Sequence, residues 1–300
     1  MKKQGQRDEG MLYLKKIGFQ KINSSLGLAH RWERLYGKDK TNQLFETWES
    51  IDGGSAAFYE FKNSDYELSK SISETYDGDI IRNECNFLAS RRKYVGKTIL
   101  EVGCESGYIT GFLASFFPES QIVAIDRSQA AIEIAKRRVS ELGCRNVEFR
   151  NCTLGDVSET YDTVVSMRTI QENIDYSNAP FKGEPISYQF LQYQELSRKH
   201  ISNLVSRVCD DGSLLVFERV DKNPLLGGML FEFCDEKCSP LVKTIETIKC
   251  HECDGFNTFH SFVCSKGLSE SKQTIDEYWC NSLGCASGKG VLDYWDALTY

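Results

Sequence analysis

Residues 98–107 read Thr-Ile-Leu-Glu-Val-Gly-Cys-Glu-Ser-Gly, and this stretch decides the fold that the sequence predicts. The apolar residues 99–100 predict a buried strand with Glu101 at its carboxyl end, and Gly103 and Gly107 bracket the turn into a helix. In open α/β sheets, ligands lie just outside the carboxyl ends of the strands. Glycines at such a turn let a ligand approach the backbone, and the start of the helix offers free N–H groups. The stretch therefore predicts a ligand-binding strand–turn–helix unit.

A second apolar strand, 121–125, ends in Asp126, at the spacing where a carboxylate binds ribose hydroxyls. Together with the glycine turn, this carboxylate predicts an adenosine-containing cofactor. A dinucleotide fingerprint needs a second glycine two residues after the first, so that a pyrophosphate can lie on the backbone. That position is Glu105 here, and the next glycine after Gly103 is Gly107. A carboxylate repels a pyrophosphate but attracts the amino group of a methionine moiety.

These residues resemble the first motif of the class I S-adenosyl-L-methionine-dependent methyltransferases, which reads acidic-x-Gly-x-Gly-x-Gly. Glu101, Gly103 and Gly107 match this motif, whereas Glu105 departs from its middle glycine. Asp126 matches the acidic residue that binds the cofactor's ribose in that family. The resemblance implies S-adenosylmethionine as cofactor and a Rossmann-like α/β fold, with a seven-stranded, mostly parallel sheet and helices on both faces.

The strand ends predict the rest of the cofactor site. After the third strand, Asn151 or Thr153 is a candidate for the adenine hydrogen bond, and Asp156 lies farther along. At the end of the fourth strand, Met167 and Arg168 are candidates to line the cofactor pocket. The full set expected to bind the cofactor is Glu101, Gly103, Cys104, Glu105, Gly107, Asp126, Arg127, Asn151, Cys152, Thr153, Met167 and Arg168.

The alternation of patterns along the chain predicts three parts: a helical N-terminal cap over 1–95, the methyltransferase core over 96–267, and a C-terminal extension over 268–300. Within the core the expected strands are 98–102, 121–126, 146–150, 161–167, 213–220, 243–249 and 257–265. The expected helices are 107–117, 128–142, 187–208 and a short one near 225–233.

Several residues predict where these elements begin and end. Asp79 is expected to cap the last helix of the cap, and Ser128 and Gly143 are expected at the two ends of helix 128–142. Residues 210–212, Asp-Asp-Gly, predict a turn before strand 213–220. Residues 254–255, Asp-Gly, predict a hairpin between the last two strands.

Methyl transfer depends chiefly on orienting an acceptor in line with the methyl group, and a general base is needed only for a protonated acceptor. Glu172 is the candidate general base or acceptor-orienting residue, and the three histidines of the core are expected to be structural. Aromatic side chains favour an apolar acceptor pocket under a helical lid and an interface between cap and sheet equally. They are Trp32, Tyr36, Trp48, Phe58, Tyr59 and Phe61 in the cap, and Tyr176, Phe181, Tyr188, Phe190 and Tyr193 after the fourth strand.

The charge distribution and the motifs of the chain limit the classes of partner that the sequence predicts. Residues 1–95 carry 16 Lys/Arg against 14 Asp/Glu and the remaining residues 20 against 29, so the catalytic part has a net charge of −9, which disfavours nucleic acid as a substrate. The fourth strand ends in Ser-Met-Arg-Thr-Ile-Gln-Glu-Asn (166–173), which differs from the Asp/Asn-Pro-Pro-aromatic and Pro-Cys motifs of nucleic-acid methyltransferases. No secretory h-region or membrane span is apparent, so we expect a cytoplasmic protein without a membrane partner.

The 12 cysteines are expected to be mostly reduced and buried. Their spacing leaves a zinc site at Cys234, Cys238, Cys250 and Cys253 as a minor alternative, and we expect no metal. The sequence thus predicts a methyltransferase that acts on an oxygen or nitrogen atom of a small molecule. The alternatives are a peptide or protein methyltransferase and a cofactor-binding partner subunit without turnover.

Overall fold

A computed structural model describes residues 7–51, 55–170, 199–219, 242–252 and 255–265. The chain divides into two compact units. The first unit comprises Met1–Arg92, Gly103–Thr153 and Lys249–Asn257, and the second comprises Lys93–Val102, Leu154–Ile248 and Thr258–Tyr300. The predicted division of the chain at residues 95 and 267, into cap, core and extension, remains a prediction. In none of the described residues is there a helix long and apolar enough to cross a membrane.

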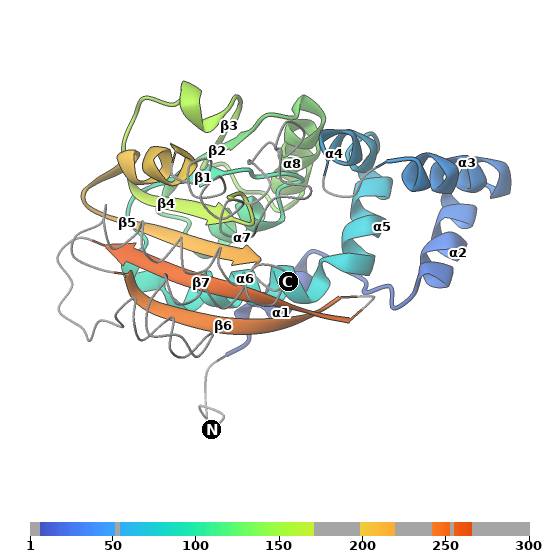
Figure 1. Ribbon diagram of the computed structural model, residues 1–300, viewed down its shortest axis with the longest axis horizontal. Helices are drawn as coiled ribbons and strands as arrows, with labels where there is room; N and C mark the ends of the chain where they lie inside the picture. The colour runs from blue at the N-terminus through green and yellow to red at the C-terminus, as the bar shows by residue number, and fades with distance from the viewer. Residues whose placement is uncertain (1–6, 52–54, 171–198, 220–241, 253–254, 266–300) are drawn as a thin grey trace, which may run out of the picture. The chain divides into compact units, whose positions relative to one another are not determined.

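The first unit begins with a run of helices, as the sequence predicts (Figure 1). Three of these helices begin at a capping side chain: Ser24, Ser55 and Asp65 each accept a hydrogen bond from a backbone N–H of the first turn. Helix α1 packs on α6, and α2 packs on α3 and α5. The helices are α1 (Glu9–Lys16), α2 (Ser25–Tyr36), α3 (Lys38–Glu49), α4 (Ala56–Lys62), α5 (Tyr66–Tyr76) and α6 (Gly78–Ser90).

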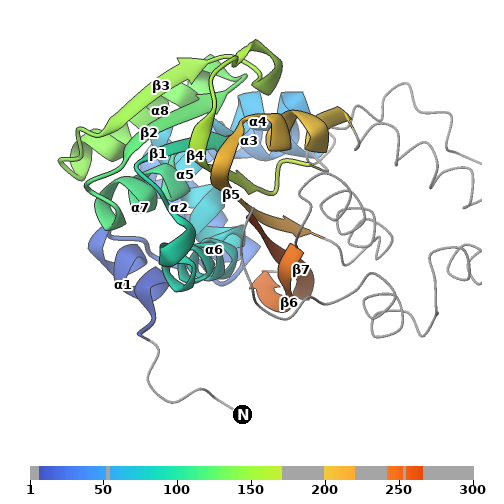
Figure 2. The same cartoon turned by 90° about the vertical axis from the view of Figure 1, so that its left-hand side faces the viewer.

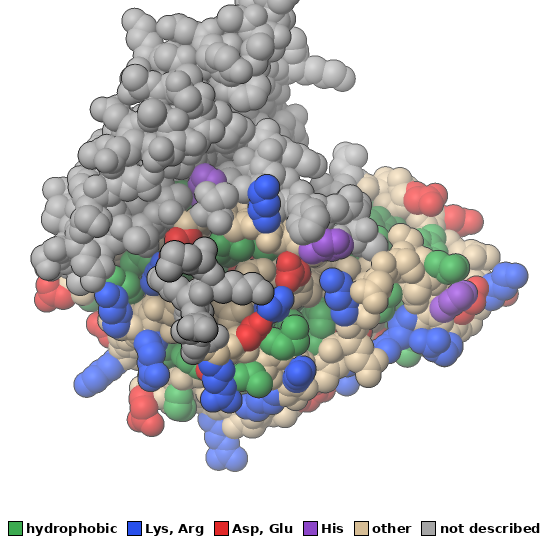
Figure 3. Space-filling view, turned by 90° about the horizontal axis from the view of Figure 1, so that it is seen from below, with side chains coloured by type: hydrophobic (Ala, Val, Ile, Leu, Met, Phe, Trp, Pro, Cys, Tyr) green, Lys and Arg blue, Asp and Glu red, His purple; other side chains and the backbone are tan. Residues whose placement is uncertain are grey.

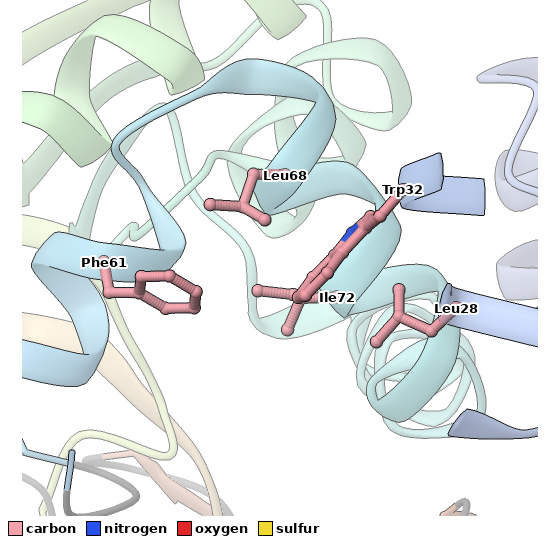
Figure 4. Close-up of a cluster of buried hydrophobic side chains, with 5 residues drawn as sticks. All are labelled: Leu28, Trp32, Phe61, Leu68 and Ile72. Carbon is pink, nitrogen blue, oxygen red and sulfur yellow. The ribbon is translucent and has the colours of Figure 1, made fainter. Parts of the chain in front are cut away.

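These helices enclose a hydrophobic core of their own, made of Leu28, Trp32, Phe61, Leu68 and Ile72 (Figure 4). The Trp32 side chain is fully buried, and its Nε1 donates a hydrogen bond to Ser71 Oγ at 2.8 Å. The Trp48 ring packs on this core, with its centroid 5.8 Å from that of Trp32. Aromatic residues of the N-terminal region therefore pack its helices against one another, a role that differs from both the lid and the interface that the sequence predicted.

The first unit continues with α7 (Tyr108–Phe116), β2 (Gln121–Asp126), α8 (Gln129–Glu141) and β3 (Val147–Asn151). Strands β2 and β3 pair in parallel, and α8 lies against both (Figure 2). As predicted, Ser128 caps α8 by accepting a hydrogen bond from Ala131 N, and Gly143 follows the helix in the left-handed region at φ +72°. On the face that Figure 3 shows, basic side chains of the described residues are interspersed with acidic and hydrophobic ones.

The second unit contains β1 (Thr98–Val102), β4 (Tyr161–Met167) and β5 (Val208–Arg219), which pair in parallel in that order. Strands β6 (Val242–Glu252) and β7 (Gly255–Ser265) follow, and β7 pairs antiparallel with β5. The complete sheet has seven strands in the order β3-β2-β1-β4-β5-β7-β6. The predicted seven-stranded, mostly parallel sheet is confirmed.

Three predicted boundaries are wrong. Helix α6 has Asp77 as its N-cap, not Asp79, although the Asp77 side chain makes no capping hydrogen bond. The predicted helix 187–208 ends earlier, because β5 already begins at Val208. Residues 210–212 are therefore strand and not turn, and a register shift in the β4–β5 pairing accommodates them. The predicted helix near 225–233 lies outside the described residues.

Candidate cofactor site

The turn after β1, residues 103–107, is the cofactor turn. Three of its residues have backbone angles in the left-handed region. The φ angles are +71° at Gly103, +43° at Glu105 and +79° at Gly107. Two of these positions are glycines, which adopt positive φ at no steric cost, whereas Glu105 bears a cost of about 1–2 kcal/mol. Glu105 thus adopts a backbone conformation suited to the middle glycine of the family motif.

Asp126 fixes this turn from the end of β2. Its Oδ2 accepts a hydrogen bond from Glu105 N at 2.9 Å, and its Oδ1 accepts one from Ser128 N at 2.8 Å. Burial raises the pKa of Asp126 above its usual range, against the lowering effect of these hydrogen bonds. A carboxylate has about four lone-pair sites, so Asp126 retains acceptor capacity for two ribose hydroxyls.

The Glu105 carboxylate has charged and polar partners of its own. Its Oε1 lies 3.2 Å from Lys62 Nζ, and its Oε2 accepts a hydrogen bond from Ser106 Oγ at 2.5 Å. Burial acts to raise the pKa of Glu105, but the Lys62 charge and the Ser106 hydrogen bond outweigh it and lower the pKa below its usual range. The carboxylate is therefore ionised at neutral pH, and 26% of its side chain is exposed.

A buried arginine supports the same turn from α8. Arg138 Nε donates to Ser106 O at 2.8 Å, and its guanidinium carbon lies 3.6 Å from the centre of the Tyr108 ring. Arg138 Nη2 and Tyr108 Oη are buried and have no hydrogen-bond partner among the described residues. Arg138 therefore joins α8 to the turn through Ser106 and Tyr108.

The residues after β3 are held next to Asp126. Asn151 Nδ2 and Cys152 N both donate to Asp126 O, at 3.0 and 3.1 Å. The side chains of Arg127, Asn151 and Thr153 are exposed. At the start of the turn, Gly103 N and Cys104 N both donate to Ile125 O, and Cys104 is buried. The first unit thus assembles nine of the 12 residues predicted to bind the cofactor around the ends of β2 and β3.

The other three predicted cofactor residues belong to the second unit. Glu101 is buried on β1 opposite Val165 of β4. Met167 ends β4 and is buried, and Arg168 follows at φ +60° with its N–H donating to Phe217 O at 2.7 Å. The predicted general base Glu172 lies outside the described residues, as do the five aromatic residues after the fourth strand.

Sequence reasoning missed the residues that hold the turns in place. Glu218 is buried on β5, and its Oε2 accepts a hydrogen bond from Ile170 N at 2.9 Å, which fixes the turn after β4. Lys62 and Glu60 of α4 contact the cofactor turn and Ser128, respectively. Charged residues inside an otherwise apolar helix such as Ala-Ala-Phe-Tyr-Glu-Phe-Lys were the available signal.

Two of the core histidines titrate far below neutral pH, and the prediction that they are structural stays a prediction. Burial lowers the pKa of both His200 and His260 to about 4, so both are neutral at pH 7. Of the four cysteines in the alternative zinc site, only Cys250 is among the described residues; it is buried, and its Sγ accepts a hydrogen bond from Asn83 Nδ2 at 3.5 Å. The no-metal expectation stays a prediction.

Comparison with known proteins shows the family to which the chain belongs. A family model described as "Methyltransferase domain" matches residues 93–273. The chain belongs to the class I S-adenosylmethionine-dependent methyltransferases. S-Adenosylmethionine is the cofactor of this family, as the glycine turn and Asp126 predict.

Curated relatives of this methyltransferase match over part of their length. Malonyl-[acyl-carrier protein] O-methyltransferase of Priestia megaterium is 38% identical over 77 residues, which cover 24% of this chain and 26% of the relative. The protein of the same name from Bacillus cereus is 37% identical over 123 residues, 40% of each chain. The chain thus spans about a quarter to two fifths of these relatives. The crystal structure of magnesium protoporphyrin IX methyltransferase (ChlM) from Synechocystis PCC 6803 with bound SAM superposes with a TM-score of 0.43 at 14% identity, over 87% of this chain and 99% of that chain.

Proposed function

We propose that this protein transfers the methyl group of S-adenosylmethionine to an oxygen or nitrogen atom of a small-molecule acceptor. The observation that supports the cofactor part of the proposal is the hydrogen bond from Glu105 N to Asp126 Oδ2, which joins the glycine turn to the carboxylate proposed to bind the ribose. In this arrangement the carboxylates of Glu105 and Asp126 are available to the amino-acid group and the ribose of one ligand, respectively.

The bound cofactor supplies a methyl group on a sulfonium centre, which an acceptor attacks in line. In the proposed site Asp126 accepts hydrogen bonds from the ribose hydroxyls, and Glu105 attracts the ammonium group. The segment after β3 provides Asn151 and Thr153 as adenine partners. Glu172 remains the proposed group that orients the acceptor or takes its proton.

Calorimetry with S-adenosylhomocysteine tests the cofactor assignment. We expect binding by the wild-type protein and a loss of about 1.5–3 kcal/mol of binding free energy in Asp126→Ala, because charge-assisted hydrogen bonds to the ribose disappear. The exposed Glu133 of α8 offers a matched carboxylate control, and Glu133→Ala should bind normally. Equal or tighter binding of NAD by the wild type would contradict the proposal.

A second candidate acceptor is an acyl group on a carrier protein, since relatives carry the name malonyl-[acyl-carrier protein] O-methyltransferase. A panel of small carboxylic acids, alcohols and amines, a malonyl thioester on pantetheine, and the same thioester on a carrier protein separates the candidates by S-adenosylhomocysteine release. Turnover of free small acids supports the first candidate. Turnover confined to the carrier-bound thioester supports the second, methylation of an unrelated peptide supports a protein methyltransferase, and no release with any acceptor supports a partner subunit.

A further inference from the structure

A buried lysine of α4 lies between two carboxylates at the cofactor turn. Lys62 is the last residue of α4 and is 5% exposed. Its Nζ lies 3.0 Å from Asp77 Oδ2 and 3.2 Å from Glu105 Oε1. The three side chains together carry a net charge of −1, and the Glu105 side chain is the most exposed of the three.

Helix α4 also contacts the turn after β2, at Ser128. Glu60 Oε1 accepts a hydrogen bond from Ser128 Oγ at 2.9 Å, and Ser128 N in turn donates to Asp126 Oδ1. The two charged residues of this short helix therefore connect it to both turns on which the proposed cofactor site depends.

We propose that Lys62 is a positioning residue for the cofactor: by pairing with Glu105 it holds the carboxylate of this left-handed residue where it meets the ligand's ammonium group. The proposal rests on the proposed function. Without the Lys62 charge, the Asp77 and Glu105 carboxylates repel each other across the space that the ammonium group of Lys62 filled. With it, the formal charges of the three side chains sum to −1 and the Glu105 carboxylate keeps its position. Helix α4 is then part of the cofactor site, a role that the predicted lid did not include.

The test compares two ligands in calorimetry: S-adenosylhomocysteine, which has the amino-acid group, and 5′-methylthioadenosine, which lacks it. For Lys62→Met we expect the Kd of S-adenosylhomocysteine to rise about tenfold to a hundredfold, the range of one charge-assisted hydrogen bond, with a change below about threefold for 5′-methylthioadenosine. Lys62→Arg should recover part of the loss because it keeps the charge. The matched control is Lys40→Met, which removes an exposed lysine of α3 and should change neither Kd.

A double-mutant cycle shows whether Lys62 acts through Glu105. In a Glu105→Gln background, Lys62→Met should add less than about threefold to the Kd of S-adenosylhomocysteine. If Lys62→Met does not fold, Asp77→Asn takes its place: it makes the cluster neutral and should weaken S-adenosylhomocysteine but not 5′-methylthioadenosine.

Equal losses for both ligands, or an unchanged Kd in both Lys62→Met and Asp77→Asn, would overturn the positioning role. Absence of S-adenosylhomocysteine binding by the wild-type protein would instead overturn the proposed function.

Discussion

At the scale of single residues, the cofactor turn shows how one position is held against its intrinsic preference. Glu105 adopts φ +43° because Asp126 accepts a hydrogen bond from its N–H and Lys62 pairs with its side chain. Packing also requires a glycine at position 107, in addition to its φ of +79°. A Cβ built there would lie 2.7 Å from both Cα and Cβ of Ala135, so α7 and α8 approach closely at this point.

Gly107→Ala is therefore expected to lower the free energy of unfolding by about 2–5 kcal/mol, the sum of a left-handed backbone cost and an overpacking cost. Gly143→Ala is the matched control, because its φ is +72° but nothing lies within 4 Å of the added Cβ. The control should cost about 1–2 kcal/mol. Urea denaturation followed by circular dichroism measures both, and an equal cost for the two variants would contradict the close helix approach.

At the scale of secondary-structure elements, the N-terminal helices have a core in which Trp48 takes part. Its ring centroid lies 5.7 Å from that of Tyr76 and 6.1 Å from that of Phe61. We expect Trp48→Ala to lower the free energy of unfolding by about 2–4 kcal/mol through lost packing. Leu26→Ala on α2, where the side chain is 65% exposed, should cost less than about 0.5 kcal/mol. A stable Trp48→Ala variant with a raised acceptor KM would instead support the lid.

Elements with a strong local signal were predictable from the sequence. Strand β1 and strand β2 have the predicted bounds, and Ser128 and Gly143 mark the ends of α8 because capping depends on residues close together in the chain. The pairing of Lys62 with Glu105 was not predictable, since the two residues are far apart in sequence and many lysines and glutamates could have met. The Asp-Asp-Gly segment of β5 lies between Val208 and Ser213, where the register of the β4–β5 pairing shifts, so a strong turn signal falls in an irregular part of a strand.

At the scale of the whole molecule, the two units are built from different parts of the chain. Apart from Lys249–Asn257, the first unit is complete at Thr153 and includes the N-terminal helices, β2, β3 and nine of the predicted cofactor residues. The second unit begins with β1 but needs β4, β5 and β7, and β7 ends at Ser265. The sequence pattern predicted the strand–helix alternation and a helical cap over 1–95, and the functional separation into cap, core and extension stays a prediction. By their contacts the N-terminal helices group with β2 and β3.

This division has a bearing on how the protein forms during synthesis. A ribosome releases the chain from its N-terminus, so the helices and the β2–β3 pair can fold while residues after 153 are still being made. In the sheet order β1 lies between β2 and β4, so β2 is available to β1 early, but the pairing of β1 with β4 and that of β5 with β7 form only after the later strand of each pair is made. We expect nascent chains that end near residue 190, with the ribosome tunnel covering the last segment, to generate folding force on an arrest sequence, and a second force to arise only after β7 emerges. A single late force would mean that the cofactor turn takes shape only when the whole sheet closes.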